Sequence, residues 1–192
     1  MQRPPGHNRR SRAGMTLLEL MVVLAVLSVL SGIAITRLNT VGFKMDAAAR
    51  TTHAAVQQAQ RLALTRQFDV IVSFDRATRR VRIAEDANND GAIAPDERVR
   101  WRALEDSARF EDPPQAVNGG GAVAIDGDNL RAVDGMPSIT FRRSGSASSE
   151  LEVYLGSKRD APDDYRAVQV SRATGRVEWF KYVGGQWRPG GL

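Results

Sequence analysis

The chain has 192 residues, a formal charge of +5 at neutral pH and no cysteine. Without cysteine no disulfide stabilises the fold, so its stability comes from packing, assembly or a bound ion. Four of the basic residues fall within residues 1–14, which contain no acidic residue: Arg3, Arg9, Arg10 and Arg12. Residues 15–192 then hold 23 basic and 22 acidic residues, a net charge of +1. This balance argues against a function that depends on broad nucleic-acid binding.

A long apolar segment follows the basic start. Residues 15–36 form a run of 22 residues in which Glu19 is the only charge. At 1.5 Å per residue, such a helix is long enough to cross a bilayer of roughly 30 Å, so we predict a single transmembrane and assembly helix. The arginines before it predict a cytoplasmic N-terminus at a bacterial inner membrane and a periplasmic C-terminal domain. A carboxylate at mid-bilayer costs about 2.5–3.5 kcal/mol, so we expect Glu19 to have a partner.

The segment Gly14-Met15-Thr16-Leu17-Leu18-Glu19 resembles the class III signal of type IV prepilins and type II secretion pseudopilins. The resemblance implies that a prepilin peptidase/N-methyltransferase removes residues 1–14 by cutting after Gly14. It also implies that Met15 becomes N-methylated and that Glu19 meets the N-terminal amine of a neighbouring subunit during assembly.

Two other interpretations of this segment stay open. A secretory signal peptide has an apolar core of ~7–15 residues and a small-residue cleavage site, for which Gly32-Ile33-Ala34 is a weak candidate. A simple membrane anchor explains the length of the run but gives no role to Glu19. The longer run and its single acid favour the prepilin interpretation.

The helical pattern continues beyond the apolar run. Residues 45–67 contain no Gly or Pro and place small and apolar side chains at helical spacing: Ala48, Thr52, Ala55, Ala59, Leu62 and Ala63. We therefore predict one helix from about 15 to about 66, whose part over 37–67 is amphipathic and packs against a sheet.

A β-rich domain is predicted over residues 68–183, and a flexible tail over 184–192. The candidate strands are 68–74, 79–83, 98–101, 138–141, 150–155, 167–171 and 176–182. Residues 112–135 are rich in Gly and Pro and predict loops. The expected fold class is α+β: a long N-terminal helix packed on an antiparallel sheet. The Ala-rich helix, the Ser-rich stretch 144–149 and the turn at 174–177 resemble the minor pseudopilin H and FimT group.

Residues 86–97 match the pattern of a calcium-binding loop, with side-chain oxygens at loop positions one, three and five, Gly91 at six and an acid at twelve. The predicted calcium ligands are Asp86, Asn88, Asp90, the Ala92 carbonyl and Glu97. The alternative is a polar hairpin loop, because Asp, Asn and Gly are also the residues of tight turns. A second acidic stretch, 124–129, is predicted to be a turn.

Basic residues near the C-terminus suggest a nucleic-acid interface: Arg176, Lys181 and Arg188. Some FimT-like minor pilins are thought to bind DNA through a basic Gly-Arg-x-Arg turn. The matching positions here are 175–178, where Glu178 replaces the last arginine and disfavours phosphate. Catalytic motifs are missing from the sequence, and His53 is expected on a helix face.

The sequence therefore predicts a non-enzymatic minor pseudopilin, a structural subunit of the type II secretion pseudopilus that supports protein export across the outer membrane. Its expected partners are the membrane, other pseudopilins or minor pilins, and the prepilin peptidase. The alternative is a FimT-like minor pilin of a type IV pilus that serves pilus priming or DNA uptake. A third alternative is a membrane-anchored, calcium-dependent enzyme.

Overall fold

The computed structural model describes residues 16–36, 40–118 and 122–191, without the side chains of residues 31–36. The chain divides after Asn39 into two compact units, each described below by itself. The predicted cleavage and methylation residues Gly14 and Met15 lie outside the described residues, as does the basic leader.

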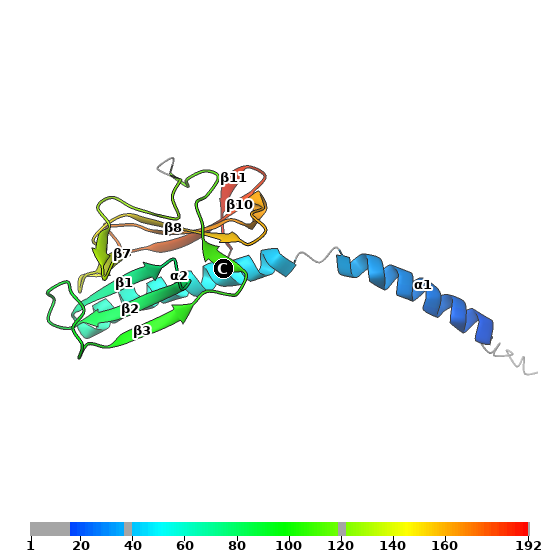
Figure 1. Ribbon diagram of the computed structural model, residues 1–192, viewed down its shortest axis with the longest axis horizontal. Coiled ribbons are helices and arrows are strands. Elements are labelled where there is room, and N and C mark those ends of the chain that lie inside the picture. Colours follow the sequence, from blue (N-terminus) through cyan, green and yellow to red (C-terminus); the bar gives the residue numbers. More distant parts are fainter. Residues whose placement is uncertain (1–15, 37–39, 119–121, 192) are drawn as a thin grey trace, which may run out of the picture. The chain divides into compact units, whose positions relative to one another are not determined.

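The first unit contains helix α1, Leu17–Thr36, of 20 residues (Figure 1). Leucine and alanine favour the helix, and Glu19 is its only charged residue. Among the described residues we find no helix whose length and apolar character suffice to cross a membrane. The membrane-spanning role of residues 15–36 stays a prediction.

The second unit begins with helix α2, Thr40–Arg66. Its buried side face carries mostly small residues: Met45, Ala48, Ala49, Thr52, Ala55, Val56, Ala59 and Ala63. The predicted stripe of small residues is thus confirmed, and it lets the sheets approach the helix closely. The predicted single helix from 15 to 66 is described as α1 and α2, with residues 37–39 outside the described part.

Eleven strands in this part form two antiparallel sheets. Sheet A has the order β3-β2-β1-β7-β6. Its strands are β1 (Asp69–Asp75), β2 (Arg80–Asp86), β3 (Val99–Ala103), β6 (Arg131–Val133) and β7 (Met136–Phe141). Sheet B has the order β11-β10-β9-β8-β4, and β5 also pairs with β8. Its strands are β4 (Ala108–Phe110), β5 (Ile125–Asp126), β8 (Leu151–Ser157), β9 (Arg166–Val170), β10 (Val177–Val183) and β11 (Gln186–Pro189).

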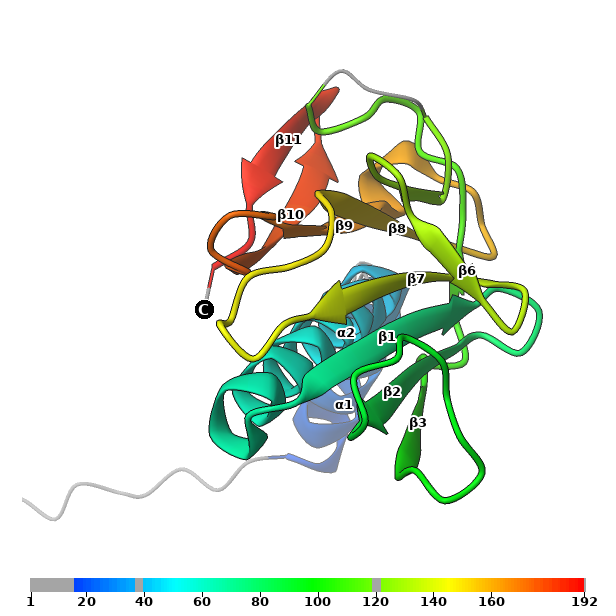
Figure 2. The same ribbon diagram turned by 90° about the vertical axis from the view of Figure 1, so that its left-hand side faces the viewer.

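Helix α2 packs against both sheets, which lie on its two flanks in Figure 2. The core between them joins small helix residues such as Ala59 to fully buried β side chains such as Phe74, Phe141 and Leu155. This arrangement confirms the predicted α+β class, a helix packed on antiparallel β-structure. All seven candidate strands are present with shifted ends, as β1, β2, β3, β7, β8, β9 and β10.

The predicted flexible tail is wrong in part, because Gln186–Pro189 forms β11 and pairs with β10. The turn between them is Gly184-Gly185, with φ values of 59° and 80°. Two consecutive residues with positive φ make the hairpin turn that matches strand twist, and glycine adopts it without strain. Trp187 then packs on Tyr182 across the pair, with ring centroids 5.0 Å apart.

Candidate functional site

Helix α1 begins with a capping arrangement around Glu19. Thr16 stands before the helix, and its hydroxyl oxygen accepts a hydrogen bond from the backbone N–H of Glu19 at 3.2 Å. The Thr16 carbonyl accepts a second bond, from Leu20 N–H at 3.1 Å. An acid in the first turn also opposes the helix dipole, which favours Glu19 by ~0.3–1 kcal/mol at an exposed site. Glu19 itself is exposed, and its carboxylate forms no ion pair with the other described residues.

Up to Leu30, helix α1 presents apolar side chains on all sides. From Leu17 to Leu30 its large apolar residues are 44–80% exposed. A helix that is apolar all round is normally covered by protein or lipid. The site at the start of α1 therefore combines one carboxylate with a surface that requires a covering partner.

The predicted calcium loop is held by hydrogen bonds within the loop. The carboxylate of Asp86, buried at the end of β2, accepts bonds from the N–H groups of Asp90 at 3.1 Å and Gly91 at 2.8 Å. Burial raises the pKa of the Asp86 carboxyl above its ordinary value, against these two hydrogen bonds, which favour its charged form.

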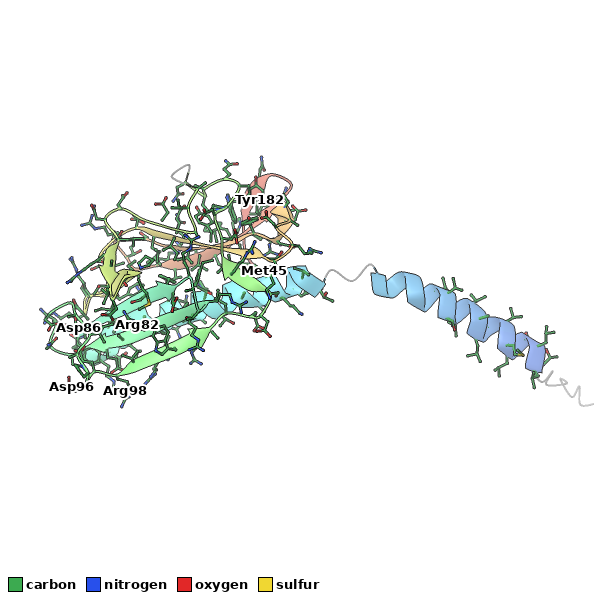
Figure 3. All side chains as sticks on the ribbon, in the orientation of Figure 1. Met45, Arg82, Asp86, Asp96, Arg98 and Tyr182 are labelled. Carbon is green, nitrogen blue, oxygen red and sulfur yellow. The ribbon has the colours of Figure 1, made fainter. Side chains whose placement is uncertain are left out.

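At the other end of the loop, Glu97 accepts bonds from Ala87 N–H at 2.8 Å and Ala94 N–H at 2.9 Å. Both acids at the loop ends are thus engaged by backbone donors. Across the described residues, no three His, Asp or Glu side chains are grouped so that they could hold a metal ion. The calcium site at Asp86, Asn88, Asp90, Ala92 and Glu97 stays a prediction, as does its alternative, a polar loop between β2 and β3. Figure 3 labels Asp86 and Asp96 at the same end of sheet A.

The second acidic stretch is more ordered than the predicted turn, because Ile125 and Asp126 form β5. Asp126 pairs with Glu152 of β8 in the register. Four acids line a pocket of about 200 Å³ here: Asp126, Asp128, Glu150 and Glu152. Glu152 is buried and accepts hydrogen bonds from Tyr154 Oη and, at 3.2 Å, from Gln169 Nε2. Burial, followed by the bond to Glu152, raises the pKa of the Tyr154 hydroxyl.

The structure pairs one of the predicted nucleic-acid residues with an acid and brings the other two together. Arg176 is paired with Glu178 at 2.7 Å. Lys181 and Arg188 lie opposite each other on β10 and β11. The interleaved Trp179 is only 7% exposed and lies below the Arg50 guanidinium, 5.7 Å from the ring centre. A buried indole gives a nucleic-acid base no face on which to stack.

His53 lies on α2, as predicted, and is half-buried. Its Nε2 lies 3.1 Å from the carbonyl oxygen of Val177 in β10. This contact connects α2 to sheet B and gives His53 a structural role where the helix packs on the sheet. Gln60, two turns further along, donates to the carbonyls of Gly145 at 3.0 Å and Thr174 at 2.9 Å.

A buried arginine, which the sequence did not reveal, connects the start of α2 to sheet B. Arg166 of β9 is 5% exposed, and its Nε donates to Asp46 of α2 at 2.6 Å. Its Nη1 donates to the carbonyls of Asp163 and Tyr165, both at 2.8 Å. The only sequence signal was an arginine directly before the predicted Val- and Ala-rich strand 167–171. We call this group the Arg166 clamp.

A second ion pair, with a buried acid and a half-exposed arginine, lies in the turn before β9. Asp164 is 1% exposed and accepts hydrogen bonds from Arg159 at 2.8 Å and Ser157 Oγ at 2.5 Å. Burial opposes its charge, but the bonds from Arg159 and Ser157 outweigh burial and hold the pKa of Asp164 below its ordinary value.

Because the pKa of Asp164 is lowered in the folded protein, the free energy of unfolding should fall when acid protonates this carboxyl. A carboxyl whose pKa is lower in the folded state stabilises the fold above its unfolded pKa of about 3.9, and the contribution is lost as pH falls through the folded value. We expect Asp164→Asn to cost about 2 kcal/mol of unfolding free energy at pH 7 and to flatten the loss of stability below pH 4. Urea unfolding between pH 3 and 7 measures this. The exposed Asp106→Asn is the matched control; an equal loss in both variants would contradict the assignment.

A comparison with known protein families concerns the N-terminal segment of the chain. Residues 9–35 match the family described as the prokaryotic N-terminal methylation motif. The match confirms the prepilin-type start that the sequence predicts. No curated protein matches the chain.

Two solved structures of the minor pseudopilin EpsH from the type II secretion system of Vibrio cholerae are similar to the chain. One has 14% identity and a TM-score of 0.49, and the match covers 72% of this chain and 97% of EpsH. The other has 17% identity and a TM-score of 0.48, and the match covers 80% and 99%. Neither likeness is close enough to assign a function.

Proposed function

We propose that this chain is a minor pseudopilin, a structural subunit that enters the pseudopilus of a type II secretion machine through its N-terminal helix. The observation that carries the proposal is the methylation motif over residues 9–35, whose helix has an exposed apolar surface and a lone carboxylate. An amine and a carboxylate are each costly in lipid, and each neutralises the other when they meet between chains.

In this role the apolar α1 lies in the inner membrane before assembly and against other subunits afterwards. The second unit, on the periplasmic side, presents its sheets to neighbouring subunits or cargo. Its partners are other pseudopilins and the prepilin peptidase that removes residues 1–14. Pairing of Arg176 with Glu178 argues against DNA uptake, the role of the alternative type IV minor pilin.

Mass spectrometry of the N-terminus tests the first step. We expect the chain recovered from membranes to start at Met15 and to carry one N-methyl group. Gly14→Val, which puts a branched side chain at the cleavage position, should leave the whole leader in place. An unprocessed leader in the unmodified chain, or a cut near Ala34, would refute the proposal.

A further inference from the structure

The outer edge of β3 is an open strand edge. Within the described residues β3 pairs only with β2. Glu85 N–H donates to the Arg98 carbonyl at 3.0 Å, and Leu104 N–H to the Arg79 carbonyl at 2.9 Å. Because alternate residues of an antiparallel strand bond to a given neighbour, the residues between these points direct their backbone groups away from the sheet: Val99, Trp101 and Ala103.

This edge is longer and more exposed than the other sheet edges in the described part of the chain. β3 has five residues, whereas the edge strands β4 and β6 have three each, and β11 ends in Pro189. Val99 is 36% and Trp101 44% exposed. An open edge with exposed apolar side chains is a template for a further strand.

A groove runs beside this edge. It has a volume of about 210 Å³ and is lined by Arg102 and by α2 residues, namely Thr51, Ala54, Ala55 and Gln58. Arg102 lies opposite the buried Val81 in the register, which places its side chain on the α2 face of sheet A. Figures 1 and 2 show β3 at the border of sheet A with α2 behind it. Small helix residues leave room for a partner's side chains next to Arg102.

The charged side chains between residues 98 and 103 are all positive. Arginine occupies every second position of the segment: Arg98, Arg100 and Arg102. Among the ion pairs of the described residues only Arg100 of these three has a partner, Glu85 at 3.8 Å. On the opposite face Trp101 lies over the buried Arg82, 5.7 Å from ring centre to guanidinium. Figure 3 shows Arg82 within the sheet and Arg98 at its rim.

We propose that β3 docks an extended acidic segment of a partner protein by strand addition. The partner strand forms backbone hydrogen bonds with Val99, Trp101 and Ala103. Its alternate side chains are acidic and reach Arg102 in the groove, while the others are apolar and lie beside Trp101. Backbone pairing supplies affinity and the groove supplies selectivity. This surface belongs to the second unit, so the inference does not depend on the filament role proposed for α1.

The test uses the full chain in detergent micelles and two labelled peptides, one alternating valine with glutamate and one alternating valine with lysine. Fluorescence anisotropy should detect saturable binding of the glutamate peptide only. Ala103→Pro removes an outward N–H while leaving the β2 pairing in place. This change and Arg102→Glu should each weaken binding roughly tenfold. Arg143→Glu, an exposed arginine in the loop after β7, should leave it unchanged.

Four results would overturn the inference: no binding of the glutamate peptide, equal binding of both peptides, wild-type affinity in Arg102→Glu, or equal losses in Arg102→Glu and Arg143→Glu. Sedimentation without peptide adds a fifth, because dimers that Ala103→Pro abolishes would assign the edge to a second copy. If Ala103→Pro fails to fold by circular dichroism, Arg102→Glu and its Arg143→Glu control decide the outcome.

Discussion

Replacing Arg166 with alanine should lower the free energy of unfolding by about 3 kcal/mol, within the ~3–5 kcal/mol range for breaking a buried ion pair. The lower end applies because the Asp46 side chain is 32% exposed and can regain water. The carbonyls of Asp163 and Tyr165 lose their donor at the same time. Both lie beside a strand that is buried, so water replaces that donor poorly.

A graded series separates charge from geometry at the Arg166 clamp. Lysine carries the same charge but offers a single point donor, so Arg166→Lys should cost about 1–2 kcal/mol. The exposed Arg143→Ala should change stability by less than about 0.5 kcal/mol. Urea unfolding of the full chain, followed by tryptophan fluorescence, gives all three values. An Arg166→Ala loss no larger than that of Arg143→Ala would show that the clamp does not stabilise the fold.

The position of the clamp gives the prediction a second readout. Asp46 lies in the second turn of α2, and Arg166 Nη2 also approaches the Gly42 carbonyl at 3.5 Å. Weakening the clamp should therefore raise amide hydrogen exchange in these first turns before it does so at Ala59. A uniform rise along α2 would mean that the whole unit opens together.

The Arg166 clamp also shows where sequence reasoning ends. Arg166 and Asp46 are 120 positions apart, and no local pattern connects an arginine in a strand with an acid on a distant helix. The strands rich in Val and Ile were predictable because their own side chains carry the signal, as in Val70–Val72. The short strands β4 and β6 were not, since tertiary pairing rather than local propensity forms them.

The hairpin that replaces the predicted flexible tail could have been predicted from the sequence. A Gly-Gly pair between two strands, here Gly184-Gly185, is typical of a β-hairpin. This pattern is more specific than the high glycine content that suggested a flexible tail. In the loop 86–97, by contrast, the sequence pattern fits two different structures. Its spacing fits a calcium loop, but the same Asp, Asn and Gly side chains also satisfy backbone N–H groups, and in this structure Asp86 and Glu97 do so.

Glu19→Gln should reduce recovery of the chain in filaments at least about tenfold, if the carboxylate pairs with the amine of Met15 in a neighbouring subunit. Glutamine keeps the size and polarity of the side chain and loses only the charge. Within one chain that charge contributes ~0.3–1 kcal/mol to the helix start, which is too little to prevent assembly. An unpaired amine left in an apolar environment costs several kcal/mol. The size of the effect thus distinguishes a local role from pairing between chains.

The matched control is Thr16→Ala, which removes the hydroxyl bond to Glu19 N–H and keeps the carboxylate. It should cost about 1 kcal/mol of helix stability and leave filament recovery largely intact. N-methylation of Met15, followed by mass spectrometry, must stay normal in both variants, since otherwise processing rather than assembly has failed. If both variants were recovered in filaments equally well, loss of the Glu19 charge would affect assembly no more than loss of the Thr16 hydroxyl. Glu19 would then act only at the start of the helix. A selective loss in Glu19→Gln would instead mean that the carboxylate acts between subunits, where the exposed apolar surface of α1 also requires a partner.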